Sequence, residues 1–76
     1  MIKELDTVVL SRDLPEHGLK RGDIGAVVHC YKGGEAFEVE FITGQGETVA
    51  VVSLNSEDVR LMQAKEILHA RELLAA

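Results

Sequence analysis

The chain has 76 residues, of which 46% are apolar and 28% are charged, and this composition suffices for one small hydrophobic core. Thirteen acidic and eight basic residues give a net charge of −5, which disfavours general nucleic-acid binding. No apolar run approaches the roughly 20 residues of a membrane span, the first residues lack the features of a signal peptide, and a single cysteine excludes an intramolecular disulfide. We therefore expect one soluble, cytoplasmic domain without a membrane partner.

Apolar and alternating runs, separated by turn residues, predict four β-strands in the first part of the chain. These runs lie at residues 7–10, 24–31, 36–42 and 47–53. In the third run we expect Phe37, Val39 and Phe41 to face the core, because successive side chains alternate between the two faces of a strand.

Two further segments have turn-like composition. Residues 11–22 are polar and broken by proline and glycine, which predicts a long loop from which Leu14 and Leu19 fold back onto the core. Residues 54–58 are predicted to form a helical turn, and residues 59–61 a short fifth strand.

Strong helix formers without glycine or proline end the chain, so we predict an α-helix over residues 62–76. At about 100° per residue, one face of this helix is apolar. That face carries Leu61, Ala64, Ile67, Leu68, Leu74 and Ala75. Arg71 interrupts the face and Leu73 lies off it. In an alternative interpretation the helix begins earlier, with Ser56 as its N-cap and two acidic residues in its first turn.

Short strands joined by turns favour a small β-barrel. The order of elements resembles a five-stranded SH3-like barrel over residues 1–61, followed by a C-terminal α-helix over residues 62–76. Residues 20–28, which read Lys-Arg-Gly-Asp-Ile-Gly-Ala-Val-Val, resemble the start of the KOW-type version of that barrel. In that resemblance the Gly-Asp pair turns the chain into a strand, and Gly25 allows a sharp bend.

A closer resemblance is to a bacterial family of small SH3-like proteins described as a domain of unknown function. The segments that carry it are residues 5–10, 14–19, 22–28, 35–41 and 58–60, so that it covers about residues 4 to 61. The resemblance implies a fold and no chemistry. Because relatives are thought to be encoded beside toxin-like proteins, it also suggests an antitoxin or immunity partner.

No residue pattern supports catalysis or cofactor binding. His29 and Cys30 are neighbours on a strand, so their side chains point to opposite faces, and we expect Cys30 to be buried and inert. The histidines and the cysteine lack metal-ligand spacing, and the glycines match no phosphate-binding motif. Glu38 and Glu40 share the ordinary solvated face of a strand. We therefore expect no enzyme activity, no metal and no cofactor.

We expect instead a non-catalytic protein-interaction module. The predicted helix exposes an apolar stripe whose interface residues are Ala64, Ile67, Leu68 and Leu74, and this favours a homodimer formed through the helix. The alternative is a helix that packs across an open end of its own barrel. An acidic surface would suit a basic protein partner. It comprises Glu38, Glu40, Glu47, Glu57 and Asp58.

The alternative function is a KOW-like nucleic-acid-binding accessory protein. Its candidate contacts are four basic residues in and near the long loop, namely Arg12, Lys20, Arg21 and Lys32. Acidic residues are interleaved with these bases and cancel much of their field. Tyr31 is the one aromatic residue left for base stacking once both phenylalanines are assigned to the core. This balance makes the protein-interaction module the preferred hypothesis.

Overall fold

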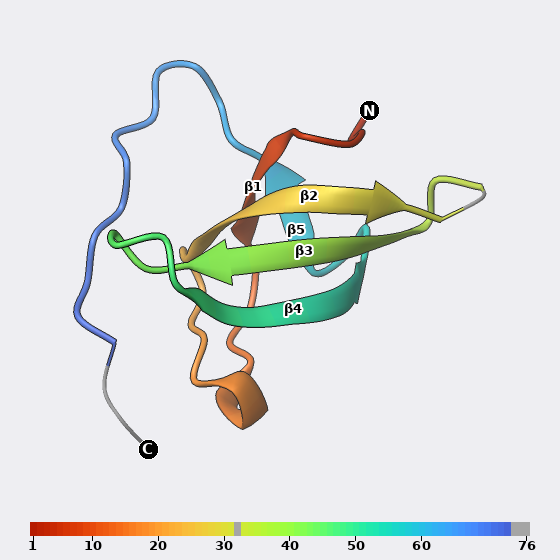
Figure 1. Ribbon diagram of the computed structural model, residues 1–76. Coiled ribbons are helices and arrows are strands. Elements are labelled where there is room, and N and C mark those ends of the chain that lie inside the picture. Colours follow the sequence, from red (N-terminus) through yellow and green to blue (C-terminus); the bar gives the residue numbers. More distant parts are fainter. Residues whose placement is uncertain (32, 74–76) are drawn as a thin grey trace.

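A computed structural model describes residues 1–31 and 33–73 as a mainly β fold with five strands (Figure 1). The strands are β1 (Thr7–Leu10), β2 (Ile24–Cys30), β3 (Ala36–Ile42), β4 (Thr48–Asn55) and β5 (Val59–Leu61). A short 3-10 helix, η1 (Pro15–His17), lies in the long first loop. All five predicted strands are confirmed. The predicted helical turn is wrong at residues 54 and 55, which extend β4 because Leu54 and Asn55 pair with β3.

The strands form one antiparallel sheet in the order β4-β3-β2-β1-β5. β4 and β5 are its two edges, and in the described part of the chain no pairing joins them. The sheet is therefore open, and the predicted closure into a barrel is not found. Two register shifts mark irregular positions of the kind that bend a sheet. One lies between Val27 and His29 in β2, and the other lies opposite Phe41 and Ile42, where Val49 of β4 is the extra residue.

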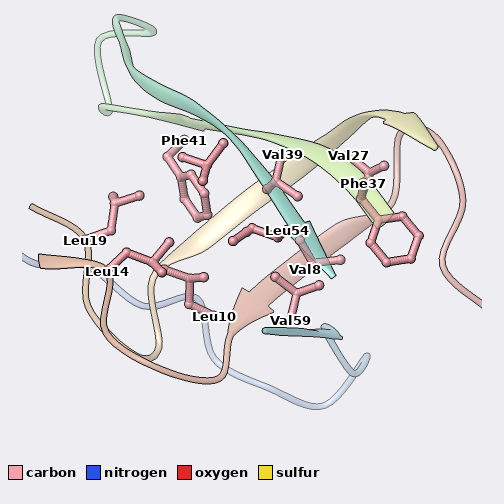
Figure 2. Packing of buried hydrophobic residues seen from close by; sticks show 11 residues of the cluster. Val8, Leu10, Leu14, Leu19, Val27, Phe37, Val39, Phe41, Leu54 and Val59 are labelled. Atoms are coloured by element: carbon pink, nitrogen blue, oxygen red, sulfur yellow. The ribbon is translucent and has the colours of Figure 1, made fainter. Parts of the chain in front are cut away.

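The core lies inside the bent sheet, and both edge strands contribute to it (Figure 2). Phe37, Val39 and Phe41 are buried in it, as the alternating pattern of β3 predicts. Leu14 and Leu19 are also buried, and they pair with each other as an isolated bridge around η1. The long loop is thus fastened to the core by its two leucines. The other buried members of the cluster are Val8, Leu10, Val27, Val52, Leu54 and Val59.

The entry into β2 is a turn built by Gly22 and Asp23. Gly22 has a φ of 95°, a left-handed conformation that glycine adopts without a steric penalty. The Asp23 backbone N–H donates to the Lys20 carbonyl at 2.9 Å, and the Lys20 N–H donates to Asp23 Oδ2 at 2.8 Å. The predicted role of the Gly-Asp pair is confirmed. Gly25 follows in β2 with an ordinary φ, and its role is close packing against β3 instead of a sharp bend.

The predicted C-terminal helix is wrong over residues 62–73. This segment (the tail) is extended apart from one turn, in which the Glu66 N–H donates to the Gln63 carbonyl at 3.0 Å. Helix propensity alone leaves so short a segment marginal in water, so tertiary contacts decide its conformation. Here side-chain ion pairs hold the tail along the sheet. The alternative helix beginning at Ser56 is not found either, since that residue lies in the turn before β5. None of the described helical residues forms a segment long enough to cross a membrane.

Candidate functional site

The outer face of strands β2, β3 and β4 is the side of the sheet turned away from the core. Strand register places Ala26, Glu40 and Val51 in one row across this face, and His29, Glu38 and Ser53 in the next. Ile42 and Thr48 pair at its far end. We call these residues the outer face. It combines two carboxylates with exposed apolar side chains, since Ile42 is 56% and Val51 is 51% exposed.

Neighbouring hydroxyl groups hold both carboxylates of the outer face. Tyr31 Oη donates to Glu38 Oε2 at 2.8 Å, and Ser53 Oγ donates to the same oxygen. Thr48 Oγ1 donates to Glu40 Oε2 at 2.7 Å. The hydrogen bonds from Ser53 and Tyr31 lower the pKa of Glu38 against a small opposing effect of burial. The contact with Glu38 in turn raises the pKa of Tyr31. Glu38 is therefore a fixed, ionised acceptor at neutral pH.

Strand β4 forms one border of the outer face and is an edge strand that charges and proline do not protect. It spans eight residues and pairs with β3 alone among the described strands. Its sequence, Thr-Val-Ala-Val-Val-Ser-Leu-Asn, contains no charged residue and no proline. Natural proteins usually protect edge strands with charges, proline or bulges, because free N–H and C=O groups invite pairing with another chain. The Asn55 N–H and C=O bond to Asp58, and Val49 is an irregular position. Between these two residues, β4 leaves the outward-facing N–H and C=O groups of alternate residues available.

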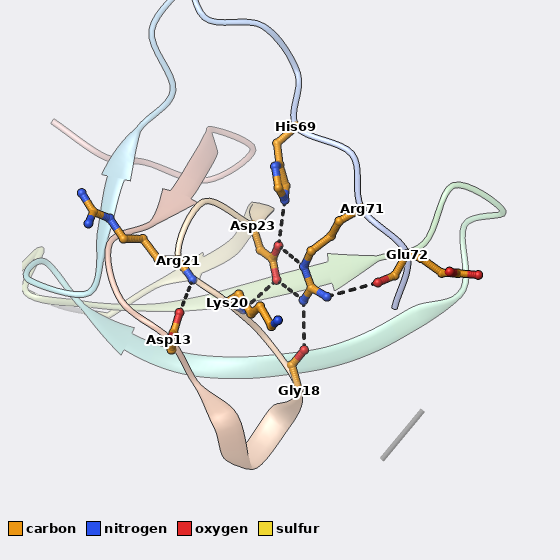
Figure 3. Close-up of polar contacts among 8 residues, drawn as sticks. All are labelled: Asp13, Gly18, Lys20, Arg21, Asp23, His69, Arg71 and Glu72. Atoms are coloured by element: carbon orange, nitrogen blue, oxygen red, sulfur yellow. Dashed lines mark hydrogen bonds and ion pairs between the residues drawn. The ribbon is translucent and has the colours of Figure 1, made fainter. Parts of the chain in front are cut away.

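The tail forms the second candidate site through Arg71, which binds Asp23 (Figure 3). Arg71 Nε donates to Asp23 Oδ1 at 2.7 Å, and Arg71 Nη2 donates to Asp23 Oδ2 at 2.6 Å. Nη2 also donates to the Gly18 carbonyl at 3.0 Å. His69 Nε2 lies 3.2 Å from Asp23 Oδ1. Two residues of the tail thus meet one carboxylate at the start of β2.

Asp23 is a nearly buried carboxylate whose charge is retained by its partners. Its side chain is 10% exposed and that of Arg71 is 22% exposed. Burial by itself would raise the pKa of Asp23, but hydrogen bonds from Arg71, Lys20 and His69, together with the charge of Arg71, outweigh it and lower the pKa. The pKa of Arg71 is raised, mainly by its hydrogen bond to Asp23. The pair is ionised and bidentate.

An open cavity of about 440 Å³ lies between the tail and the sheet. Its walls on the sheet side are mainly apolar and include Leu19, Phe41 and Val49, and its tail side includes Leu73. Asp23 and Arg71 line the same cavity. In Figure 1 the tail passes the turn between β3 and β4, and Gly44 of that turn also lines the cavity. We call this cavity together with Asp23 the Asp23 pocket.

The predicted interface residues lie on the tail but share no helical face. Ala64 is exposed, Ile67 is 92% exposed and Leu68 is 73% exposed. Leu74 lies outside the described residues. A second ion pair holds the start of the tail, with Arg60 bidentate on Glu66 at 2.7 and 2.8 Å. The hydrogen bond from Arg60 lowers the pKa of Glu66 to about 2. The helical route to a homodimer is therefore absent over residues 62–73, and self-association stays a prediction.

The three described residues among the predicted nucleic-acid contacts each lie beside an acidic residue. Arg12 Nε donates to Asp58 Oδ1 at 2.6 Å, so its guanidinium already has an acidic partner. Lys20 and Arg21 are exposed at the other end of the loop, where the Arg21 N–H donates to Asp13 Oδ1. Lys32 lies outside the described residues.

His29 and Cys30 are neighbours in β2, and their side chains lie on different sides of the strand, but the prediction that Cys30 is buried holds only in part. Cys30 packs against the core but is only partly buried, with Sγ 3.9 Å from the Ile2 carbonyl oxygen. His29 is exposed and stacks edge-on against Tyr31. Among residues 1–31 and 33–73, no three groups able to bind a metal lie together. The absence of enzyme activity and of cofactors stays a prediction.

Comparison with protein families gives one match, over residues 4–61. The chain belongs to the family described as a domain of unknown function (DUF4926). No curated protein and no solved structure matches it. The DUF4926 match includes β4, both carboxylates of the outer face, and Asp23. The tail and Arg71 lie beyond it.

The sequence analysis did not predict the pairing of Arg71 with Asp23. Its signal in the sequence was the position of Arg71, a charged residue that interrupts an otherwise apolar pattern.

Proposed function

We propose that this DUF4926 protein is a non-catalytic interaction module that binds an extended, basic segment of a partner protein along β4. The observation that carries the proposal is the uncharged eight-residue edge strand beside two fixed carboxylates. In strand addition, main-chain hydrogen bonds supply affinity and alternate side chains supply specificity. β4 offers the backbone groups for such pairing, and the outer face offers the specificity.

The geometry of a sheet accounts for the preference for basic side chains. Neighbouring strands lie about 4.8 Å apart, so an added strand would run roughly 10 Å from β3. A lysine or arginine on its outward face can extend across Val51 and place its cation near Glu40 or Glu38. The apolar stem then covers the exposed Val51 side chain. A net charge of −5 would also speed the approach of a basic partner.

We also propose that the sheet is an open form of the SH3-like arrangement predicted from the sequence. Its support is the position of β1 between β2 and β5, because a small barrel requires the last strand to return to the first.

An antitoxin-like or immunity-like partnership would be one instance of the proposed function. Nothing in the placement of Arg12, Lys20 and Arg21 adds to the nucleic-acid alternative, which stays a prediction.

The test uses a peptide of alternating lysine and valine, matched to β4 in length, and follows the protein by NMR. We expect the peptide to bind and to slow hydrogen exchange of β4 amides that lack a partner in β3. The Glu38→Gln/Glu40→Gln double variant keeps acceptors for the hydroxyl groups. It should weaken binding about two- to thirtyfold, because each of the two exposed charge pairs contributes about 0.2–1 kcal/mol. A glutamate-valine peptide should not bind.

Val51→Lys tests directly whether the peptide binds along β4. It places a cation on the edge strand opposite Glu40, where the fold can accommodate it, and should repel the basic peptide. Gln63→Lys is the matched control, since it adds the same charge at an exposed position in the tail. Binding that survives Val51→Lys, or protection that appears away from β4, would contradict strand addition. The nucleic-acid alternative would be favoured if a DNA oligonucleotide bound as tightly as the lysine-valine peptide and its affinity fell steeply with salt concentration.

A further inference from the structure

The site around Asp23 has the geometry of a receptor for one arginine side chain. Two carboxylate oxygens and the Gly18 carbonyl lie where a planar guanidinium can reach all three. A guanidinium fits such a planar set of acceptors with parallel N–H donors, whereas an ammonium group acts as a point charge and lacks this planar pair of donors. The Lys20 N–H also donates to Asp23 Oδ2, so the carboxylate is held by the domain itself.

The two halves of this interaction belong to different parts of the chain. Asp23, Gly18 and the apolar walls on the sheet side lie within residues 4–61, which match the DUF4926 family. Arg71 and Leu73 lie outside that span. The receptor is therefore part of the domain, while the arginine that fills it is supplied by a segment that follows the domain.

The tail occupies the Asp23 pocket incompletely. Arg71 closes the polar end, but about 440 Å³ of space remains beside Phe41, Val49 and Leu73. The tail also gains little from apolar burial, since Ile67 and Leu68 are mostly exposed. A second copy of the tail would leave the same space and gain nothing by exchange. A different segment, with an arginine and a larger apolar side chain near it, would fill the pocket better.

We propose that the Asp23 pocket is an arginine-binding site, that Arg71 occupies it within the chain, and that an arginine-bearing, extended segment of a partner protein enters when the tail leaves. The partner's arginine takes the place of Arg71 between Asp23 and Gly18. A bulky apolar side chain beside it enters the space next to Phe41. Val49 of β4 lines this pocket, but the Asp23 and Gly18 oxygen atoms that bind the arginine lie outside β4. The arginine site can therefore be tested separately from strand addition.

The test uses the full chain carrying Arg71→Ala and a capped peptide with the sequence of residues 66–73, with affinities measured by calorimetry. We expect the peptide to bind this variant and to bind the unaltered chain at least about tenfold more weakly, because the tethered Arg71 competes for Asp23. A peptide carrying Arg71→Lys should lose about tenfold or more in affinity, since lysine cannot make the bidentate contact. A peptide carrying Leu73→Trp should bind more tightly by filling the cavity.

Two controls separate the site from a general effect on folding. Lys65→Ala alters an exposed tail residue and should leave the full chain as closed to the peptide as the unaltered protein. Asp23→Asn added to Arg71→Ala keeps an acceptor for the Lys20 N–H and should abolish binding. If Arg71→Ala fails to fold, Arg71→Lys replaces it in the binding measurement. This variant keeps the positive charge but binds Asp23 more weakly, so the peptide can still compete for the pocket. Equal binding of the arginine and lysine peptides, or no peptide binding to a folded Arg71 variant, would overturn the proposal.

Discussion

Gly25 offers the most direct quantitative test of the packing between β2 and β3. A Cβ atom at this position would lie 2.6 Å from Val39 Cγ1, 2.9 Å from Phe41 Cε1 and 3.0 Å from the Glu40 carbonyl oxygen. Val39 and Phe41 are both buried in the core, so neither side chain has room to withdraw. The carbonyl belongs to the backbone of β3 and can move only if the strand moves. Gly25→Ala therefore forces β2 and β3 apart.

The expected cost follows from these contacts. Adding a methyl group to a well-packed core costs about 1–3 kcal/mol. Replacing glycine with alanine returns about 0.4–1 kcal/mol by restricting the unfolded chain. The two ranges leave a net loss of about 0–2.6 kcal/mol, with roughly 1–2 kcal/mol near their centre. A domain of this size loses about 4–8 °C in melting temperature per kcal/mol. Gly25→Ala should thus lower the melting temperature by roughly 4–16 °C, and the chain should remain folded because a domain of this size has about 4–11 kcal/mol of stability.

Gly44→Ala is the matched control. A Cβ at Gly44 meets no atom within 4 Å, and Gly44, like Gly25, lies outside the left-handed region. We expect this variant to melt at or slightly above the temperature of the unaltered protein. Both variants can be compared by thermal unfolding followed by circular dichroism and by urea denaturation. The reasoning is refuted if Gly25→Ala melts within one or two degrees of Gly44→Ala, since the two strands would then have room for a methyl group.

Three further predictions follow from the polar contacts. Asp58→Ala should lose about 1–3 kcal/mol in urea denaturation, because it removes a buried acceptor of a backbone N–H, whereas Glu57→Ala should change stability by less than about 0.5 kcal/mol. Since the pKa values of Asp23 and Asp58 are lowered in the folded protein, the stability they contribute is complete above their ordinary pKa of 3.8 and is lost as the pH falls below it, which acid titration of the melting temperature can check. Circular dichroism of the full chain should show no helical signal from residues 62–73, and a helical spectrum would contradict the extended tail.

The strands were predictable because their signals are local. Alternation across Phe37, Val39 and Phe41 identifies a half-buried strand without knowledge of its neighbours. The Gly-Asp turn before β2 is likewise set by a left-handed backbone position and a side-chain hydrogen bond within three residues. The role of Gly25 could not be predicted in this way, because the atoms that crowd it belong to another strand. The openness of the sheet also depends on long-range pairing, which no local pattern specifies.

The tail and the outer face could not be derived from the sequence for the same reason. Helix propensity over residues 62–76 is real but weak, and it is outweighed in the described part by a contact between residues 48 positions apart, Arg71 and Asp23. The outer face depends on register, since Tyr31 and Ser53 reach Glu38 only when their strands are aligned as they are. The position of Arg71 within an otherwise apolar pattern was the sequence feature that indicated a contact between the tail and a distant residue.

The distribution of ion pairs strengthens the case for a basic partner at β4. Three of the four arginines of the chain already have acidic partners, since Arg12 contacts Asp58, Arg60 contacts Glu66 and Arg71 contacts Asp23. These pairs cancel charge within the loop and the tail. On the outer face the partners of Glu38 and Glu40 are mainly neutral hydroxyl groups, which fix the two carboxylates without cancelling their charge. Two carboxylates that no arginine neutralises therefore lie beside the long, uncharged edge strand β4, where an added basic strand would meet both features together.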